Sequence, residues 1–191
     1  MSRQFNLFCA VFALTVFLSC SKDKAATIDN YGNSPATALP AEFDKGLWFW
    51  GNFGPISYYD QNGHEVGNET EAARQYAFSE VNGKARLEFT QYLGLRNASN
   101  CVTEIYTTKK GTVAFEGSAK LTFYPVEGNF RTIKKGCSDN GTETRAASAE
   151  DLKAESYFYE VKVIDGSKLL YLYDSNDEEM QNPVFVYEQA N

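Results

Sequence analysis

Short strand-like runs separated by turn signals repeat along the chain from Ala41 onward. Asn82-Gly83 lies between two such runs, and Asp165-Gly166 lies between two others. Asn-Gly and Asp-Gly are among the dipeptides most favoured in tight β-hairpins. Apolar and polar residues alternate along residues 85–90, which gives a strand one dry face and one wet face. The pattern therefore predicts an antiparallel β-protein built from sequential hairpins.

The segment from residue 41 to residue 191 is predicted to form a single all-β domain. The chain is 43% hydrophobic and 15% aromatic, which suffices for one core and favours β structure. About nine or ten predicted strands follow one another through short turns, as in an antiparallel up-and-down meander. Closing this meander into a barrel of about 8–10 strands removes its exposed edges.

Three local features are expected to interrupt the regular meander. One or two short helical turns are expected, at residues 68–74 and at residues 148–153, which begin with the capping residues Asn68 and Ser148. Pro125 is expected to end a strand, because it has no backbone N–H to donate. Residues 136–147 are predicted to form the longest polar loop.

Aromatic residues are concentrated in the first predicted strand and shortly after it. Adjacent side chains of a strand point to opposite faces, so Trp48 and Trp50 share one face and Phe49 takes the other. Core packing and ligand binding both remain open for this group. The candidate ligand-binding residues are Trp48, Trp50, Phe53, Tyr58 and Tyr59.

The N-terminal residues have the features of an export signal. Arg3 precedes an apolar run over residues 5–18 that is too short to span a membrane as a mature helix. The run ends in Phe17-Leu18-Ser19-Cys20, which resembles a bacterial lipobox. This resemblance implies that residues 1–19 are a lipoprotein signal peptide and that Cys20 receives the lipid.

Residues 20–40 are predicted to be the lipidated cysteine and a flexible tether. Their Ala, Thr, Asn, Ser and Pro content shows no apolar periodicity, so they cannot bury enough surface to offset the entropy of ordering. Ser21-Lys22-Asp23-Lys24 is similar to the tether starts of lipoproteins from Bacteroidetes. The similarity implies a lipid-anchored protein of the outer membrane, at its periplasmic face or on the cell surface.

Two of the four cysteines remain once Cys9 and Cys20 are assigned to the signal peptide and the lipid site. In an oxidising compartment, Cys101 and Cys137 are expected to form a disulfide. The competing metal site would need further ligands, and the chain contains a single histidine, His64.

The folded segment resembles the lipocalin-like (calycin) barrels. Gly46-Leu47-Trp48 is similar to their Gly-x-Trp motif, in which the Trp closes one end of the barrel. Tyr58-Tyr59-Asp60, the strand Lys110-Gly111-Thr112-Val113 and the two spaced cysteines resemble small lipocalin-like lipoprotein domains of Bacteroidetes. Gly-x-Trp also begins avidin-like barrels. The family pattern includes an Arg stacked on the Trp, for which Arg131 and Arg145 are the candidates.

Composition and spacing argue against several kinds of site. The formal net charge of −7, without a basic stripe, argues against nucleic-acid binding. His64 is in a turn region, and no serine elbow is visible for a catalytic triad. Residues 60–71 lack the ligand spacing of a calcium loop. The acidic residues at 174–179 are expected to be a solvated loop.

Paired carboxylates for glycoside hydrolysis are not evident either. Glu88, Glu104 and Glu160 fall on the polar faces of predicted strands, and nothing singles out a pair. No catalytic residue, metal or cofactor is therefore predicted, and the chain is not expected to be an enzyme.

These observations predict a non-catalytic binding module held at the membrane by the lipid on Cys20. Its ligand is expected to be a small apolar molecule in the barrel, or a glycan on its rim. The alternative is a structural or accessory lipoprotein with a filled barrel, acting through contacts with an envelope protein, as an inhibitor or assembly component.

Overall fold

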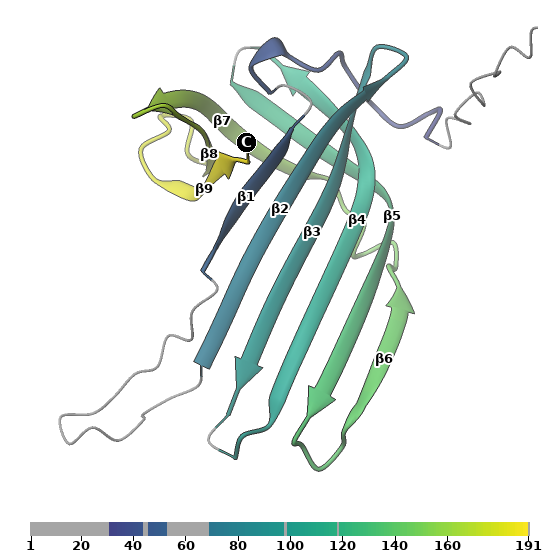
Figure 1. Cartoon of the computed structure of the whole chain (residues 1–191). Coiled ribbons are helices and arrows are strands. Elements are labelled where there is room, and N and C mark those ends of the chain that lie inside the picture. Colours follow the sequence, from purple (N-terminus) through teal and green to yellow (C-terminus); the bar gives the residue numbers. More distant parts are fainter. Residues whose placement is uncertain (1–30, 44–45, 53–68, 98, 118, 191) are drawn as a thin grey trace, which may run out of the picture.

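The computed structural model describes residues 31–43, 46–52, 69–97, 99–117 and 119–190 (Figure 1). Within them, one 3-10 turn, η1 (Ala41–Phe43), precedes nine strands. No helix in this described part is long and apolar enough to cross a membrane. The strands are β1 (Leu47–Asn52), β2 (Glu69–Val81), β3 (Lys84–Arg96), β4 (Val102–Glu116), β5 (Lys120–Lys135), β6 (Gly141–Ala146), β7 (Glu155–Ile164), β8 (Ser167–Asp174) and β9 (Pro183–Gln189).

Eight of these strands close into an antiparallel barrel. The order around the sheet is β4-β3-β2-β1-β9-β8-β7-β5, and β5 pairs back with β4 to complete the ring. β6 is an additional strand outside the ring. The predicted all-β meander and its closure are thus confirmed.

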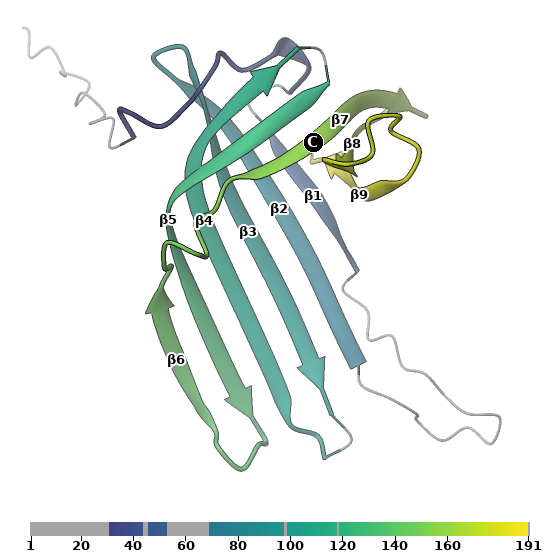
Figure 2. The same cartoon turned by 180° about the vertical axis from the view of Figure 1, so that it is seen from behind.

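The sheet continues beyond the barrel as a single layer, because β5 has two different partners. Lys120–Phe123 of β5 pair with β7 in the barrel wall, whereas Asn129–Lys134 pair with β6. The far halves of β2, β3, β4 and β5, together with β6, therefore form an extension of the barrel wall (Figures 1 and 2). We call this part the sheet extension.

Two hairpin turns have the predicted chemistry. Asn82 and Gly83 have φ values of 54° and 72°, and Asp165 and Gly166 have values of 51° and 86°. Two consecutive positive φ values characterise a type I′ turn, whose twist matches that of the flanking strands. Both dipeptides therefore set the register of their hairpins, β2–β3 and β7–β8.

The expected end of a strand at Pro125 is wrong, because β5 runs through it. Pro125 lies opposite Gly111, where the β4–β5 register shifts between Lys110 and Gly111. An irregularity of this kind tolerates a residue without an N–H. A Cβ on Gly111 would lie 2.7 Å from the Cα of Pro125 and would clash with the carbonyl oxygen of Tyr124. Glycine is thus required for the close approach of β4 and β5.

Three further local expectations are corrected. The predicted helical turn at residues 68–74 falls largely within β2, where pairing with β3 from Glu69 to Val81 outweighs the local capping signal. The predicted loop at 136–147 contains β6. Ser148 and Asp151 do form reciprocal side-chain hydrogen bonds, but they close one turn rather than a helix.

The barrel core is packed with large side chains. Trp48, Leu170, Leu172 and Tyr187 have no exposed surface, and Leu121 has almost none. At one end, Phe43 contacts the rings of Trp48, Phe78, Phe115 and Tyr159 at centroid distances of 4.8–6.2 Å. The Trp48 indole also donates a hydrogen bond to the Phe43 carbonyl oxygen. This end of the barrel is therefore closed by aromatic packing.

Residues 31–40, which the sequence assigns to the tether, lie against the barrel. Thr37 accepts a backbone hydrogen bond from Ala85 and donates one to Val113. Ser34 shares a hydrogen bond with Thr112, and the Tyr31 hydroxyl donates to Glu127. This part of the predicted tether is held on β3, β4 and β5.

The predicted disulfide is confirmed. Cys101 and Cys137 are bonded, with their Cα atoms 4.5 Å apart. Val102 and Lys135 form the last pair of the β4–β5 ladder. The disulfide therefore closes the far end of the sheet extension.

Candidate functional site

One row of side chains crosses the inner face of the sheet where the barrel gives way to the sheet extension. Opposite residues of neighbouring antiparallel strands share a face. Their register places Trp50, Arg74, Gln91, Thr107, Phe130 and Arg145 in line, on the same face as the core residue Tyr76. We call this level the barrel mouth.

Arg74 is the central charge of the barrel mouth. Its guanidinium carbon lies 4.1 Å from the ring centroid of Phe185 and 5.7 Å from that of Phe89. Trp50 packs edge-on against Phe185, with centroids 5.2 Å apart. Arg74 is half-buried and has no ion pair with any described residue. A guanidinium held on aromatic rings retains its hydrogen-bond donors for an acceptor from outside.

The Tyr187 hydroxyl lies next to this charge. Its ring is fully buried and stacks on Tyr76 at a centroid distance of 4.7 Å. The hydroxyl makes no hydrogen bond of good geometry to a described residue, but it lies within interaction range of Arg74 and Tyr76. Arg74 and Tyr76 lie near enough to affect its pKa, but burial dominates and raises that pKa to about 12. Tyr187 therefore supports Arg74 from within the packed core.

A second polar group of the barrel mouth is already paired. Lys109 Nζ donates to Glu155 Oε1 at 2.8 Å, and only 13% of the Lys109 side chain is exposed. Burial, followed by the nearby Glu155 charge, raises the pKa of Tyr157. Lys109 is thus occupied by Glu155, whereas Arg74 has no ion pair with a described residue.

Apolar residues lie on the same face just beyond the barrel mouth. The next row contains Ala72, Leu93 and Ile105, all half-buried, and Leu95 lies one row further and is 37% exposed. We call these four residues the apolar shelf. A cation beside an apolar shelf is complementary to a ligand with an anionic group and an apolar body.

The buried tyrosine predicts how stability depends on pH. The pKa of Tyr187 is about 12 in the folded protein and near 10 in an unfolded chain, so the folded state holds this proton more tightly. Its contribution is fully present below about pH 10 and is lost as pH rises towards 12. We expect the free energy of unfolding to fall over this range, and to fall less steeply in Tyr187→Phe. Urea unfolding at several pH values measures this, and equal slopes would contradict it.

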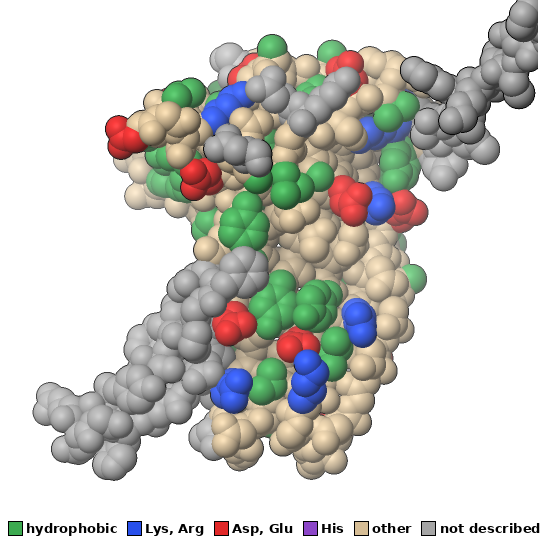
Figure 3. All heavy atoms as spheres, in the orientation of Figure 1, with side chains coloured by type: hydrophobic (Ala, Val, Ile, Leu, Met, Phe, Trp, Pro, Cys, Tyr) green, Lys and Arg blue, Asp and Glu red, His purple; other side chains and the backbone are tan. Residues whose placement is uncertain are grey.

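Two other hollows contain charged side chains that pair with each other or with a tyrosine. On the outer face, Glu71, Tyr92, Gly94 and Glu104 help to line a hollow of about 110 Å³. Tyr92 donates to Glu71 there, and Figure 3 shows hydrophobic side chains among acidic and basic ones on the lower part of this face.

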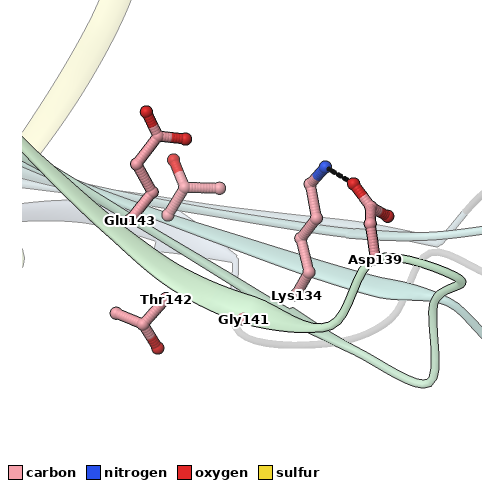
Figure 4. A pocket seen from close by; sticks show the side chains of 6 residues that line it. Lys134, Asp139, Gly141, Thr142 and Glu143 are labelled. Atoms are coloured by element: carbon pink, nitrogen blue, oxygen red, sulfur yellow. Dashed lines mark hydrogen bonds and ion pairs between the residues drawn. The ribbon is translucent and has the colours of Figure 1, made fainter.

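A polar pocket lies at the turn between β5 and β6 (Figure 4). It has a volume of about 200 Å³, and Lys134 pairs in it with Asp139 while Glu143 extends from the same face. The Lys134 ammonium holds the pKa of Asp139 below its ordinary value. Because Lys134 and Asp139 neutralise each other and the walls are polar, the pocket offers little to an apolar ligand.

The predicted aromatic site is divided by the structure. Trp48 is part of the closed core, whereas Trp50 is half-buried at the barrel mouth. Phe53, Tyr58 and Tyr59 lie outside the described residues, as do Cys20 and His64.

Neither Arg131 nor Arg145 stacks on Trp48. Lys168 Nζ lies 5.8 Å from the Trp48 ring, and Arg145 lies instead over Phe130. β8 brings Lys168 to the face that Trp48 occupies, whereas Arg145 is on β6, outside the barrel. The prediction considered only arginines, whereas the cation near Trp48 is Lys168, which β8 brings there.

Arg74 and Tyr187 are not among the site residues predicted from the sequence. They become neighbours only through closure of the barrel, which joins β1 to both β2 and β9. The sole local signal was an arginine at an inward-facing position among apolar residues of β2.

The strand carboxylates named from the sequence are neutralised individually. Glu88, Glu104 and Glu160 each form an ion pair with a lysine. Asp177 accepts backbone hydrogen bonds from Gln181 and Asn182, so it shapes its loop. Over the described ranges, no three His, Cys, Asp or Glu side chains are placed to hold a metal ion.

Comparison of the chain with protein-family models, curated proteins and solved structures found no match in any of the three.

Proposed function

We propose that this protein is a non-catalytic binding module for a small amphipathic ligand, which binds at the barrel mouth. The observation that carries the proposal is Arg74, which is half-buried over the ring of Phe185 and has no ion pair in the described part of the chain. An anionic or acceptor group of the ligand bonds to the Arg74 guanidinium. Its apolar body lies along the apolar shelf and against Trp50.

The packed core determines which way the ligand lies. Trp48, Leu170 and Tyr187 leave no exposed surface deep in the barrel. The apolar body therefore extends outward, and the ligand occupies the mouth rather than a deep cup.

The cellular setting is part of the same proposal. The lipobox-like Phe17-Leu18-Ser19-Cys20 and the lipocalin-like Gly46-Leu47-Trp48 support a lipid-anchored barrel of the outer membrane, facing the periplasm or the cell surface. The eight-stranded antiparallel barrel is consistent with a lipocalin-like fold. A second candidate function is an accessory lipoprotein that acts through protein contacts, and the filled barrel is the observation that favours it.

Decanoate and decanol test the ligand class, because they share an apolar body and differ in charge. Calorimetric titration is expected to show that the protein binds decanoate more tightly than decanol. Arg74→Met keeps the apolar stem and removes the charge, so decanoate affinity should fall roughly 10- to 100-fold while decanol affinity changes little.

Arg131→Met is the matched control. Arg131 is exposed and lies opposite Tyr106, on the outer face of the sheet, so its replacement should leave both affinities unchanged. Decanoate binding that survives Arg74→Met would refute the assignment of the anionic group. Absence of binding for both probes would refute the ligand class and favour the accessory function.

A further inference from the structure

β6 is an open edge of the sheet. It is the last strand in the sheet order and pairs only with β5 in the described part of the chain (Figures 1 and 2). All six of its residues are exposed. An edge strand presents a row of backbone groups to any chain that can pair with it.

The backbone groups that face outward can be assigned from the ladder. The N–H of Ala147 donates to the carbonyl of Gly128, and the β5–β6 register continues from that pair. Antiparallel residues alternate between facing the partner strand and facing away. Glu143 and Arg145 therefore bond to β5, and Thr142, Thr144 and Ala146 direct their N–H and C=O groups away from it.

Two of the usual protections of an edge strand, a proline and a β-bulge, are missing from β6. One outward carbonyl, that of Ala146, accepts a hydrogen bond of 3.3 Å from its neighbour Arg145. The second lone pair of the Ala146 carbonyl, and the outward N–H and C=O groups of Thr142 and Thr144, remain available to a pairing strand.

Two charges of opposite sign flank the centre of the edge. Glu143 and Arg145 lie on the inner face, opposite Thr132 and Phe130 of β5. Arg145 is held over Phe130 at 4.0 Å and pairs with Asp151 at 2.8 Å. Glu143 has no ion pair with the residues that the structure describes. The edge thus carries one positioned cation and one unpaired anion, two residues apart.

We propose that β6 pairs antiparallel with β6 of a second copy of this chain, with Thr144 opposite Thr144 at the two-fold axis. This register joins the outward groups of Thr142, Thr144 and Ala146 in three hydrogen-bonded pairs. It also places Glu143 of each copy opposite Arg145 of the other, twice per dimer. Opposite charges at directly facing positions stabilise an antiparallel pair.

Neighbouring registers are less favourable for the same reason. A two-fold axis at Glu143 places Glu143 opposite itself, and an axis at Arg145 places two guanidiniums together. Like charges at facing positions destabilise the pair. Because the strand contributes only six residues, the contact is small and the association is weak and reversible.

Cysteine cross-linking of the full-length protein tests the proposal and its register. Thr144→Cys should form a disulfide-linked dimer under mild oxidation, because cross-strand Cα atoms in such a pair lie at a distance that a disulfide spans. The parent protein gives the background from its native cysteines. Val163→Cys is the control for exposure, because Val163 is 71% exposed and lies on β7.

Charge variants separate a specific edge contact from random collision. Glu143→Arg in the Thr144→Cys background should reduce the cross-linked fraction roughly tenfold, since two attractive pairs become repulsive. Adding Arg145→Glu should restore it. Thr142→Cys combined with Ala146→Cys should also cross-link, whereas Thr142→Cys alone should not.

Three outcomes would overturn the proposal. The first is a Thr144→Cys dimer no more abundant than that of Val163→Cys. The second is a cross-linked fraction that does not change in the charge variants. The third is an adduct whose mass differs from twice that of the chain. The first two would exclude the register or the contact, and the third would identify a different partner. None of them depends on Arg74 or on a bound ligand.

Discussion

Replacing Trp48 with alanine is expected to destabilise the fold by about 3–5 kcal/mol, because it empties the closed end of the barrel. The Trp48 side chain has no exposed surface, contacts Phe43 and donates to its carbonyl oxygen. Its removal leaves a cavity among the aromatic rings and an unsatisfied carbonyl. Urea unfolding followed by circular dichroism measures the loss.

Trp50→Ala is the internal control for this measurement. Trp50 has the same chemistry and lies two residues away on the same face, but it is half-buried at the barrel mouth. Its loss should cost about half as much, because less apolar surface leaves a packed environment. Equal destabilisation by the two substitutions would contradict the division between core and mouth.

Replacing Cys101 and Cys137 together with serine is expected to lower the free energy of unfolding by about 3–4 kcal/mol. The bond joins residues 36 apart, and in the chain-entropy model a loop of this size gives a stabilisation of that order. The disulfide also fastens the end of the sheet extension beside the last β4–β5 pair. Hydrogen exchange should therefore accelerate most in β6 and in the far ends of β4 and β5.

Reduction of the parent protein provides the control for the serine variant. A reductant should lower its unfolding free energy to that of the double variant and should not affect the double variant itself. A loss below about 1 kcal/mol in both cases would mean that strand pairing alone holds the sheet extension closed.

The features that were predicted correctly depend on residues adjacent in the sequence, or are ones for which few alternatives exist. Asn82-Gly83 and Asp165-Gly166 form their turns because positive φ values suit these residues. Cys101 and Cys137 were paired by elimination. Trp48 and Trp50 share a face because of the two-residue period of a strand, and this held in β1.

The features that escaped prediction depend on contacts between distant strands. β5 passes through Pro125 because Gly111, on another strand, permits a close approach there. β6 has no dry face, so its sequence lacks the alternation by which strands are recognised. Arg74 meets Phe185 only after the barrel closes. Closure and pairing therefore determine the site more than any local pattern does.

The chain contains two tryptophans, which makes one measurement decisive for the proposed site. In a proton–nitrogen NMR spectrum, each indole N–H gives a separate signal, one for Trp48 in the core and one for Trp50 at the barrel mouth. Addition of decanoate is expected to shift the Trp50 signal and leave that of Trp48 unchanged. Movement of the Trp48 signal would show that the ligand enters the packed core, and bound decanoate that moves neither would place its site away from the mouth.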